Sequence, residues 1–143
     1  MYQSSKDAAP AAVSAPRRNL RILYADDLDE LRDVARISLG REGHGVDCVA
    51  DGALALAQVV ADSNYDLVIT DHLMPNMNGL ELVTKLRERE FPGKVMVVSS
   101  ELSTAIAEQY RQQKVDRILY KPVFPSTLRT TLVEIFPPAV PAA

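Results

Sequence analysis

The sequence contains no tryptophan and only one cysteine in 143 residues. A single cysteine, Cys48, excludes an intramolecular disulfide framework. Together with only two histidines, which lie far apart in the chain, it also makes a zinc site a poor interpretation. Aromatic residues are few, so aliphatic side chains are expected to fill the core, and a composition that is 47% hydrophobic is sufficient for one.

Long apolar runs and an excess of positive charge are also missing. No stretch approaches the ~20 apolar residues of a membrane-spanning helix. Residues 1–19 contain no continuous apolar segment of the kind that a signal peptide needs. The formal net charge of −3 disfavours direct nucleic-acid binding. We therefore expect a soluble, cytoplasmic protein with one folded domain.

Alanine, serine and proline dominate both ends of the chain. Residues 1–18 are predicted to be a flexible N-terminal tail, and residues 137–143 a C-terminal tail or the start of a linker. The folded domain is predicted to span residues 19–136. Two interpretations of this length stay open, a single-domain protein or a piece of a longer one, and the initial Met1 favours the first.

Between the tails, the hydrophobic pattern switches repeatedly between the periods of strands and helices. This alternation predicts an α/β fold, a doubly wound parallel sheet of five strands with five helices on its two faces. Asp47 interrupts the second strand, which is therefore predicted to lie at a sheet edge, and Asn78 and Glu81 are spaced as a capping box. The predicted strands are 20–25, 45–50, 65–70, 93–100 and 117–120, and the predicted helices are 27–41, 52–62, 78–90, 101–112 and 126–135.

Polar residues collect at the points where four of these strands end. The carboxyl ends of parallel strands meet at one edge of a sheet, which is where such sheets bind ligands. Three carboxylates, one hydroxyl and one ammonium group are therefore expected to converge there. The residues are Asp26 and Asp27 after the first strand, Asp71 after the third, Ser99 at the end of the fourth and Lys121 after the fifth.

This set of groups predicts metal-assisted phosphoryl chemistry. Carboxylates brought together repel one another, and burial adds to the cost of their ionised forms. A divalent cation relieves that cost, and a site with only oxygen ligands suits Mg²⁺. Lys121 can pair with a carboxylate or with a phosphate oxygen. A carboxylate in such surroundings can act as a nucleophile and form an aspartyl phosphate.

Four segments of the chain resemble the receiver domain of bacterial two-component response regulators. The resemblance covers residues 19–136 and implies a flavodoxin-like sheet in the order 2-1-3-4-5. It also implies a signalling phosphoacceptor that is not an enzyme acting on other molecules, with a histidine kinase or a phosphotransfer protein as donor. The segments are 22–27 (ILYADD), 66–82 (DLVITDHLMPNMNGLEL), 94–100 (KVMVVSS) and 120–122 (YKP).

The resemblance implies how the acidic residues divide the work. Asp71 is the expected phosphoacceptor. Mg²⁺, or Mn²⁺, is expected to be bound by Asp27, Asp71 and the backbone carbonyl of Leu73, and Asp26 is expected to act mostly through a bound water. The apolar side chain of Leu73 lies on the expected approach of the attacking water, so we expect it to slow loss of the phosphoryl group.

The resemblance also indicates which residues respond to phosphorylation. Lys121 is expected to contact the phosphoryl oxygens and to precede a cis peptide bond to Pro122, while Ser99 is expected to swing toward the phosphoryl group. The family often has an aromatic switch residue three positions before the lysine, and here that position is Ile118. Tyr120 faces the same side of the strand, but it is interpreted as an ordinary edge-strand tyrosine.

The partner surface is expected on helix 101–112, strand 117–120 and helix 126–135, in a monomer or weak dimer. The identity of the partner, the cognate kinase and the pathway cannot be predicted from the sequence. Two further residues are interpreted as bystanders. His72 is expected to point away from the acceptor, and His44, between two glycines, is expected to be a surface histidine with its hydrogen bonds satisfied.

Three other functions are compatible with parts of the pattern. A haloacid-dehalogenase-type phosphatase needs a second acid two residues after its nucleophile, where this chain has Leu73. A phosphorylation-independent interaction module on the same fold would not need the five polar residues, which are all present. A nucleotide-binding sheet needs a glycine-rich loop after its first strand, and here that turn is Ala25-Asp26-Asp27.

Overall fold

The computed structural model describes residues 19–138 of the chain. The described residues belong to two compact units, one formed by Leu20–Val123 and the other including the segment from Phe124 onward. The predicted tail 1–18 and residues 139–143 of the predicted C-terminal tail lie outside the described residues. The sheet and all candidate site residues belong to the first unit.

The first unit is built on a sheet of five parallel strands in the order β2-β1-β3-β4-β5, which confirms the predicted fold and strand order. The pairing aligns Ala25 with Thr70, Thr70 with Val97, and Val97 with Ile118. β1 and β3 therefore end level with each other, and β4 and β5 end level with each other two residues further along, at the same edge of the sheet. The strands are β1 (Arg21–Ala25), β2 (Gly45–Val49), β3 (Leu67–Thr70), β4 (Lys94–Ser99) and β5 (Arg117–Tyr120).

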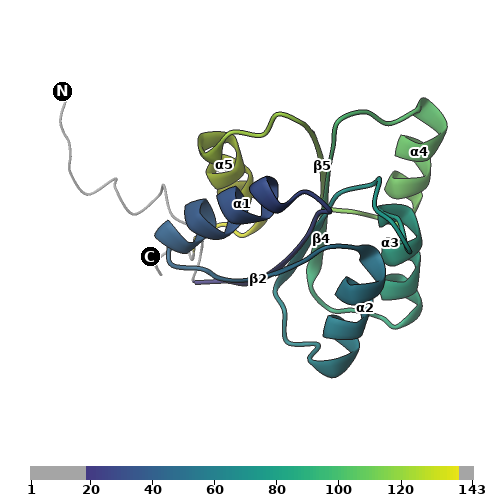
Figure 1. Cartoon of the computed structure of the whole chain (residues 1–143), viewed down its shortest axis with the longest axis horizontal. Coiled ribbons are helices and arrows are strands. Elements are labelled where there is room, and N and C mark those ends of the chain that lie inside the picture. The colour runs from purple at the N-terminus through teal and green to yellow at the C-terminus, as the bar shows by residue number, and fades with distance from the viewer. Residues whose placement is uncertain (1–18, 139–143) are drawn as a thin grey trace, which may run out of the picture. The chain divides into compact units, whose positions relative to one another are not determined.

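Helices cover both faces of this sheet. The helix α1 (Asp29–Arg41) lies on one face, while α2 (Gly52–Ala61), α3 (Gly79–Glu88) and α4 (Thr104–Gln112) lie side by side on the other (Figure 1). The second unit contains α5 (Pro125–Ile135), which has a proline in its first turn. None of the described helices combines the length and the apolarity needed to cross a lipid bilayer.

Side-chain caps explain where two of the helices begin. Asn78 accepts a hydrogen bond from the backbone of Glu81, whose side chain accepts one from the backbone of Asn78, so the predicted capping box is confirmed. The prediction that a helix starts at residue 101 is wrong, because α4 begins at Thr104. The side chain of Ser103 accepts a hydrogen bond from the backbone N–H of Ile106 and so caps α4 at this point.

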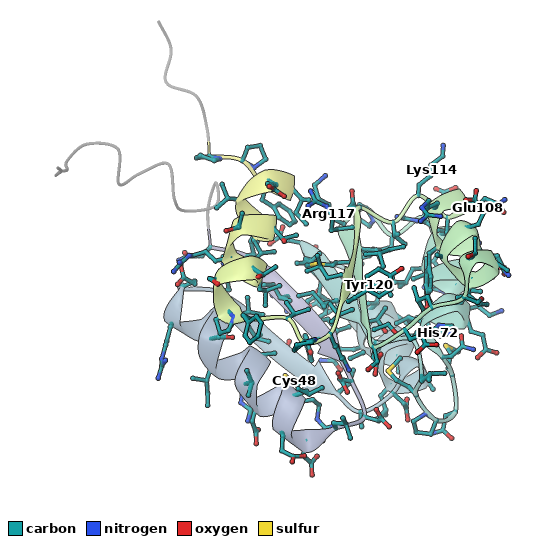
Figure 2. The ribbon with its side chains drawn as sticks, turned by 90° about the horizontal axis from the view of Figure 1, so that it is seen from above. Cys48, His72, Glu108, Lys114, Arg117 and Tyr120 are labelled. Carbon is teal, nitrogen blue, oxygen red and sulfur yellow. The ribbon has the colours of Figure 1, made fainter. Side chains whose placement is uncertain are left out.

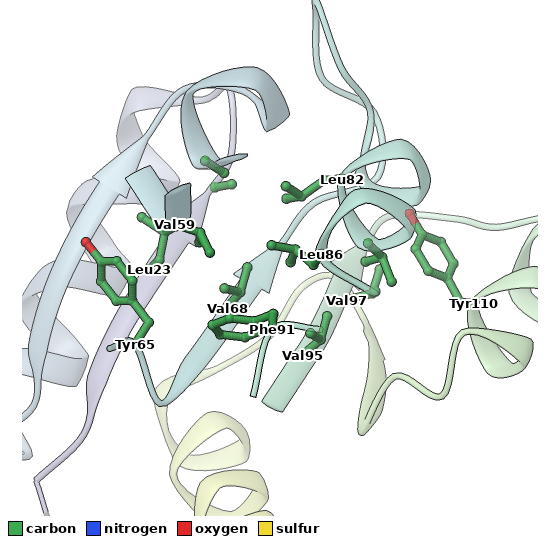
Figure 3. Close-up of a cluster of buried hydrophobic side chains, with 13 residues drawn as sticks. Leu23, Val59, Tyr65, Val68, Leu82, Leu86, Phe91, Val95, Val97 and Tyr110 are labelled. Carbon is green, nitrogen blue, oxygen red and sulfur yellow. The ribbon is translucent and has the colours of Figure 1, made fainter. Parts of the chain in front are cut away.

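The core between the sheet and α2, α3 and α4 holds the central strands rigidly in place. The strands β1, β3 and β4 are almost entirely buried, whereas β2 and β5 are only partly buried, as expected of edge strands. Tyr110 of α4 is completely buried in this cluster (Figure 3). Each fully buried aliphatic side chain contributes about 2 kcal/mol. The strand ends are thus presented by the most strongly packed part of the unit.

His44 is buried, and the prediction of a surface histidine is wrong. Its side chain is only 6% exposed, and its Nδ1 accepts a hydrogen bond of 2.9 Å from the backbone N–H of Leu20. The backbone supplies the reason, because this N–H lies just before β1 and the imidazole satisfies it. Burial lowers the pKa of His44. Protonation of Nδ1 would remove the acceptor that Leu20 uses.

We predict that substituting His44 with Asn reduces the pH dependence of stability. Asn keeps an acceptor for the Leu20 N–H but does not titrate. Because the pKa of His44 is lower in the folded than in the unfolded chain, its contribution to stability is complete above about pH 6.5 and is lost as the pH falls below that value. Urea unfolding at a series of pH values would measure this loss in the wild type, and the two curves would run parallel if His44 were not responsible.

Candidate functional site

Three carboxylates converge at the carboxyl end of the sheet, as the sequence predicts. Asp26 and Asp27 follow β1, and Asp71 follows β3. One carboxylate oxygen from each lies within 4.8 Å of the other two. Asp26 and Asp71 are buried, at 1% and 8% exposure, whereas Asp27 is exposed. Asp26 and Asp71 are therefore shielded from solvent, whereas Asp27 faces it.

Lys121 brings a positive charge between the two buried acids. Its Nζ donates a hydrogen bond of 2.9 Å to Asp26 Oδ2 and one of 3.2 Å to Asp71 Oδ2. The backbone N–H of Lys121 donates to the carbonyl of Ser99, so the chain after β5 is attached to the end of β4. The peptide bond from Lys121 to Pro122 is cis, as expected. The ammonium group is thus positioned by its own backbone.

The electrostatics of the site favour a further cation. Burial and the nearby Asp26 raise the pKa of Asp71, although Lys121 and the backbone N–H of His72 act against this. Burial alone would lower the pKa of Lys121, but its bonds to Asp26 and Asp71 outweigh burial and raise it. Three carboxylates and one ammonium leave a formal charge of −2. A divalent cation would neutralise that charge.

The donor set fits Mg²⁺ by its chemistry. The three side chains offer only carboxylate oxygens, which hard divalent cations prefer, and neither nitrogen nor sulfur ligands are among them. A site with so few protein groups also suits Mg²⁺, which keeps several of its waters. Leu73, whose carbonyl is an expected ligand, lies two residues beyond Asp71 with its side chain 70% exposed. The geometry of this fourth ligand stays a prediction.

The two oxygens of Asp71 have different surroundings. Oδ1 accepts a hydrogen bond of 2.7 Å from the backbone N–H of His72. Oδ2 faces Lys121. The backbone of Asp71 is held as well, since its N–H donates to Ala25 and its carbonyl accepts from the hydroxyl of Thr70. Oδ2 is therefore the oxygen that faces the acidic cluster, on a residue whose backbone is fixed on both sides.

Ser99 and Ile118 lie where the sequence predicts, but the structure does not test their roles. Ser99 is buried, and its hydroxyl donates a hydrogen bond of 3.3 Å to the carbonyl of Glu101. To reach Asp71, this hydroxyl would have to leave that long bond. Ile118 packs against the core cluster, and Tyr120 is half exposed on the edge strand. Neither supplies a buried aromatic hydroxyl near Ser99.

Tyr24 is a site residue that the sequence reasoning missed. Its side chain is buried, and burial raises its pKa, with further contributions from Asp26 and Asp71. The signal was available in the sequence, because residues two apart on a strand face the same side. The run of apolar residues around Tyr24 hid that signal.

The side chain of His72 points away from the acidic cluster, but it is held in place by burial and by a hydrogen bond. It is buried at 9% exposure, and its Nδ1 lies 2.6 Å from the hydroxyl of Tyr110 in α4. Burial lowers the pKa of His72, while the charge of Asp71 acts in the opposite direction. Nothing in the local sequence indicates this contact, since the two residues are 38 positions apart.

Comparison with known proteins gives consistent matches over the described sheet and helices. A sequence model of the response regulator receiver domain matches residues 22–133. The sensory/regulatory protein RpfC of Xanthomonas campestris is 34% identical over 122 residues, which cover 82% of this chain but 17% of RpfC. The sensor protein EvgS of Escherichia coli is 33% identical over 127 residues, 89% of this chain and 10% of EvgS. The chain thus spans a small part of these relatives.

Solved structures show the same architecture. The chemotaxis protein CheY4 of Vibrio cholerae superposes with a TM-score of 0.76 at 28% identity, covering 82% of this chain and 99% of that one. A CheY-like receiver domain from Methanospirillum hungatei gives a TM-score of 0.78 at 26% identity, covering 83% of this chain and 94% of the other. These likenesses agree with the strand order found here.

We predict that Asp71→Asn stabilises the metal-free protein at neutral pH. Because the folded-state pKa of Asp71 is raised, its contribution to stability is present at low pH and is lost as the pH rises through that pKa. At pH 7 the ionised carboxylate therefore destabilises the folded state, and Asn removes this charge. Thermal unfolding in the presence of a chelator would measure the difference.

Mg²⁺ should reverse this order. At a concentration 100 times its Kd, a ligand of the folded state stabilises by about 2.7 kcal/mol, and the wild type should gain more than Asp71→Asn, which lacks one carboxylate ligand. Asp33→Asn is the matched control, because Asp33 is an exposed acid of α1. An equal gain from Mg²⁺ in all three proteins would contradict a metal site at the acidic cluster.

Proposed function

The chain belongs to the response regulator receiver domain family, and we propose that it is a phosphoacceptor of a two-component or phosphorelay system, with Asp71 as the phosphorylated residue. The observation that carries this proposal is the surroundings of Asp71 Oδ2. Asp71 is a buried residue, and its Oδ2 faces Lys121 at 3.2 Å and lies beside two further acids that can share a cation with it. The donor is a histidine kinase or a phosphotransfer protein.

The residues of the site divide the transfer between them. Oδ2 of Asp71 attacks the phosphorus, a new O–P bond forms, and the bond from phosphorus to the donor's histidine nitrogen breaks with its electron pair returning to the imidazole. Lys121 is already beside Oδ2 and can pair with a phosphoryl oxygen as that bond forms. Asp27, Asp71 and the carbonyl of Leu73 would hold Mg²⁺, with Asp26 acting through water. Mg²⁺ bound there would supply positive charge that offsets the negative charge of the transferred group.

Phosphorylation then changes the face that binds the downstream partner, which we place on α4 and β5. Ser99 turns from Glu101 toward the phosphoryl group, and the segment that leads into α4 follows it. A groove of about 320 Å³ between α4 and β5 supports this location. Its lining residues are Arg111, Val115, Asp116, Arg117, Ile118 and Tyr120.

We predict that the wild type acquires one phosphoryl group when incubated with acetyl phosphate and Mg²⁺, and that Asp71→Asn acquires none. The amide has no anionic oxygen to act as nucleophile. Intact-protein mass spectrometry would count the groups, and Asp33→Asn should be phosphorylated like the wild type. An unmodified wild type would favour the alternative of an interaction module that works without phosphate, and sustained hydrolysis of a small phosphate ester would favour a phosphatase.

We predict that Leu73→Asn shortens the lifetime of the phosphorylated form, by roughly tenfold or less, because an amide can orient the attacking water but takes no proton from it. The side chain of Leu73 is 70% exposed, so the substitution should leave the fold intact. Leu54→Asn, at a half-exposed leucine of α2, is the control. Decay of the phosphoprotein, followed by mass spectrometry, at the same rate in all three proteins would refute this role.

A further inference from the structure

A buried hydrogen bond connects the residue after Asp71 to the inner face of α4. His72 Nδ1 and the hydroxyl of Tyr110 lie 2.6 Å apart, and their rings meet edge to face with centroids 5.5 Å apart and planes at 81°. Tyr110 is completely buried and extends from α4 toward α3 (Figure 3), and His72 lies near α4 whereas Tyr120 extends from β5 (Figure 2). The bond is therefore shielded from water. Hydrogen bonds are stronger in such a low-dielectric interior than in water.

The backbone of His72 is tied to the acceptor at the same time. Its N–H donates to Asp71 Oδ1 at 2.7 Å, and its carbonyl accepts from the N–H of Gly79 at 2.8 Å. The imidazole bond to Tyr110 fixes the side chain of the same residue. With its N–H, its carbonyl and its ring all engaged, His72 is held at three points, one of which is the carboxylate of Asp71.

The atoms around the His72–Tyr110 pair are closely packed. A Cβ atom placed on Gly79 would lie 2.4 Å from the carbonyl oxygen of Asp71 and 2.6 Å from the hydroxyl of Tyr110. Real Cβ atoms do not approach other atoms so closely, so only glycine fits where α3 begins. The start of α3, the acceptor's backbone and the Tyr110 hydroxyl thus meet at one point. Because these groups are closely packed, a small displacement of one requires the others to move as well.

The C-terminal end of α4 is also attached to α3. The guanidinium of Arg87, on α3, donates to the carbonyls of Gln113 and Lys114 at 2.8 and 3.0 Å. These bonds fix the C-terminal end of α4, within one turn of Tyr110. Tyr110 lies on the last turn of the same helix. Its contact with His72 therefore sets the position of the inner face of α4 relative to the segment that follows Asp71.

We propose that His72 and Tyr110 are positioning residues of the phosphoacceptor. The Tyr110 hydroxyl holds the His72 imidazole, the His72 N–H holds Asp71 Oδ1, and Oδ2 is thereby turned toward Lys121. The same bond makes the seating of α4 depend on the state of Asp71. Ile118 has no polar atom in its side chain, so this route reaches α4 without the β5 position. The proposal rests on the function of Asp71 proposed above.

The test compares four variants with the wild type in the presence of Mg²⁺ and beryllofluoride, a phosphoryl analogue. Tyr110→Phe removes only the hydroxyl, and His72→Leu removes the imidazole. His72→Asn keeps a polar atom near the position of Nδ1 and should rescue the bond in part. Tyr65→Phe is the matched control, since it removes a buried tyrosine's hydroxyl that bonds to Asp47 and not to a residue of the site. Amide NMR shifts of α4 and of the loop after β1 report on the two ends of the route.

We expect the α4 shift changes to fall about fivefold in Tyr110→Phe and His72→Leu, the effect of losing one hydrogen bond that differs between two states. They should recover in part in His72→Asn and stay unchanged in Tyr65→Phe. The loop after β1 should respond fully in every variant that binds the analogue. Thermal unfolding identifies variants that are merely destabilised, and those would still show the full α4 response at saturation.

Two results would overturn the proposal, and they can be told apart. A wild-type α4 response in both Tyr110→Phe and His72→Leu, with the analogue bound, would refute the role of the pair and leave Asp71 as the acceptor. If the wild type itself bound no analogue, the phosphoacceptor function would fail, and the positioning role with it. Should His72→Leu not fold, Tyr110→Phe and His72→Asn still decide the question.

Discussion

The ammonium group of Lys121, placed between two buried carboxylates, is the interaction on which the rest of the site depends. Asp26 and Asp71 are both out of water, where ionised carboxylates without a partner are costly. Lys121 bonds to both, yet the formal balance of the cluster stays negative once Asp27 is included. Lys121 therefore offsets part of the negative charge of the cluster, and the charge that remains favours binding of a cation.

The sheet makes this convergence possible because its parallel strands all end at one edge. Parallel pairing of four neighbouring strands places residues from positions 26, 71, 99 and 121 at one edge, although they are far apart in the chain. The central strands are buried on both faces, so the edge that they present does not move easily. The adaptable parts are the loops that follow the strands and α4, to which the His72–Tyr110 bond is attached.

Much of this could be predicted from the sequence, because the deciding signals are local. Apolar periodicity predicted the strands and helices, the Asn78–Glu81 spacing predicted a capping box, and the strand ends predicted the acidic cluster. Burial of His44 and the bond between His72 and Tyr110 could not be predicted, since both depend on which distant groups meet in the fold. The start of α4 was misjudged because Ser103 caps it, a competition between neighbouring polar residues that periodicity does not resolve.

The most direct measurement is to locate the phosphoryl group chemically. Borohydride reduces an aspartyl phosphate to homoserine, so treatment of the phosphorylated wild type, followed by peptide mapping, marks the acceptor itself. The account predicts homoserine at position 71 and unmodified aspartate at positions 26 and 27. Homoserine at either of those positions, or a phosphorylated protein in which position 71 stays aspartate, would contradict it.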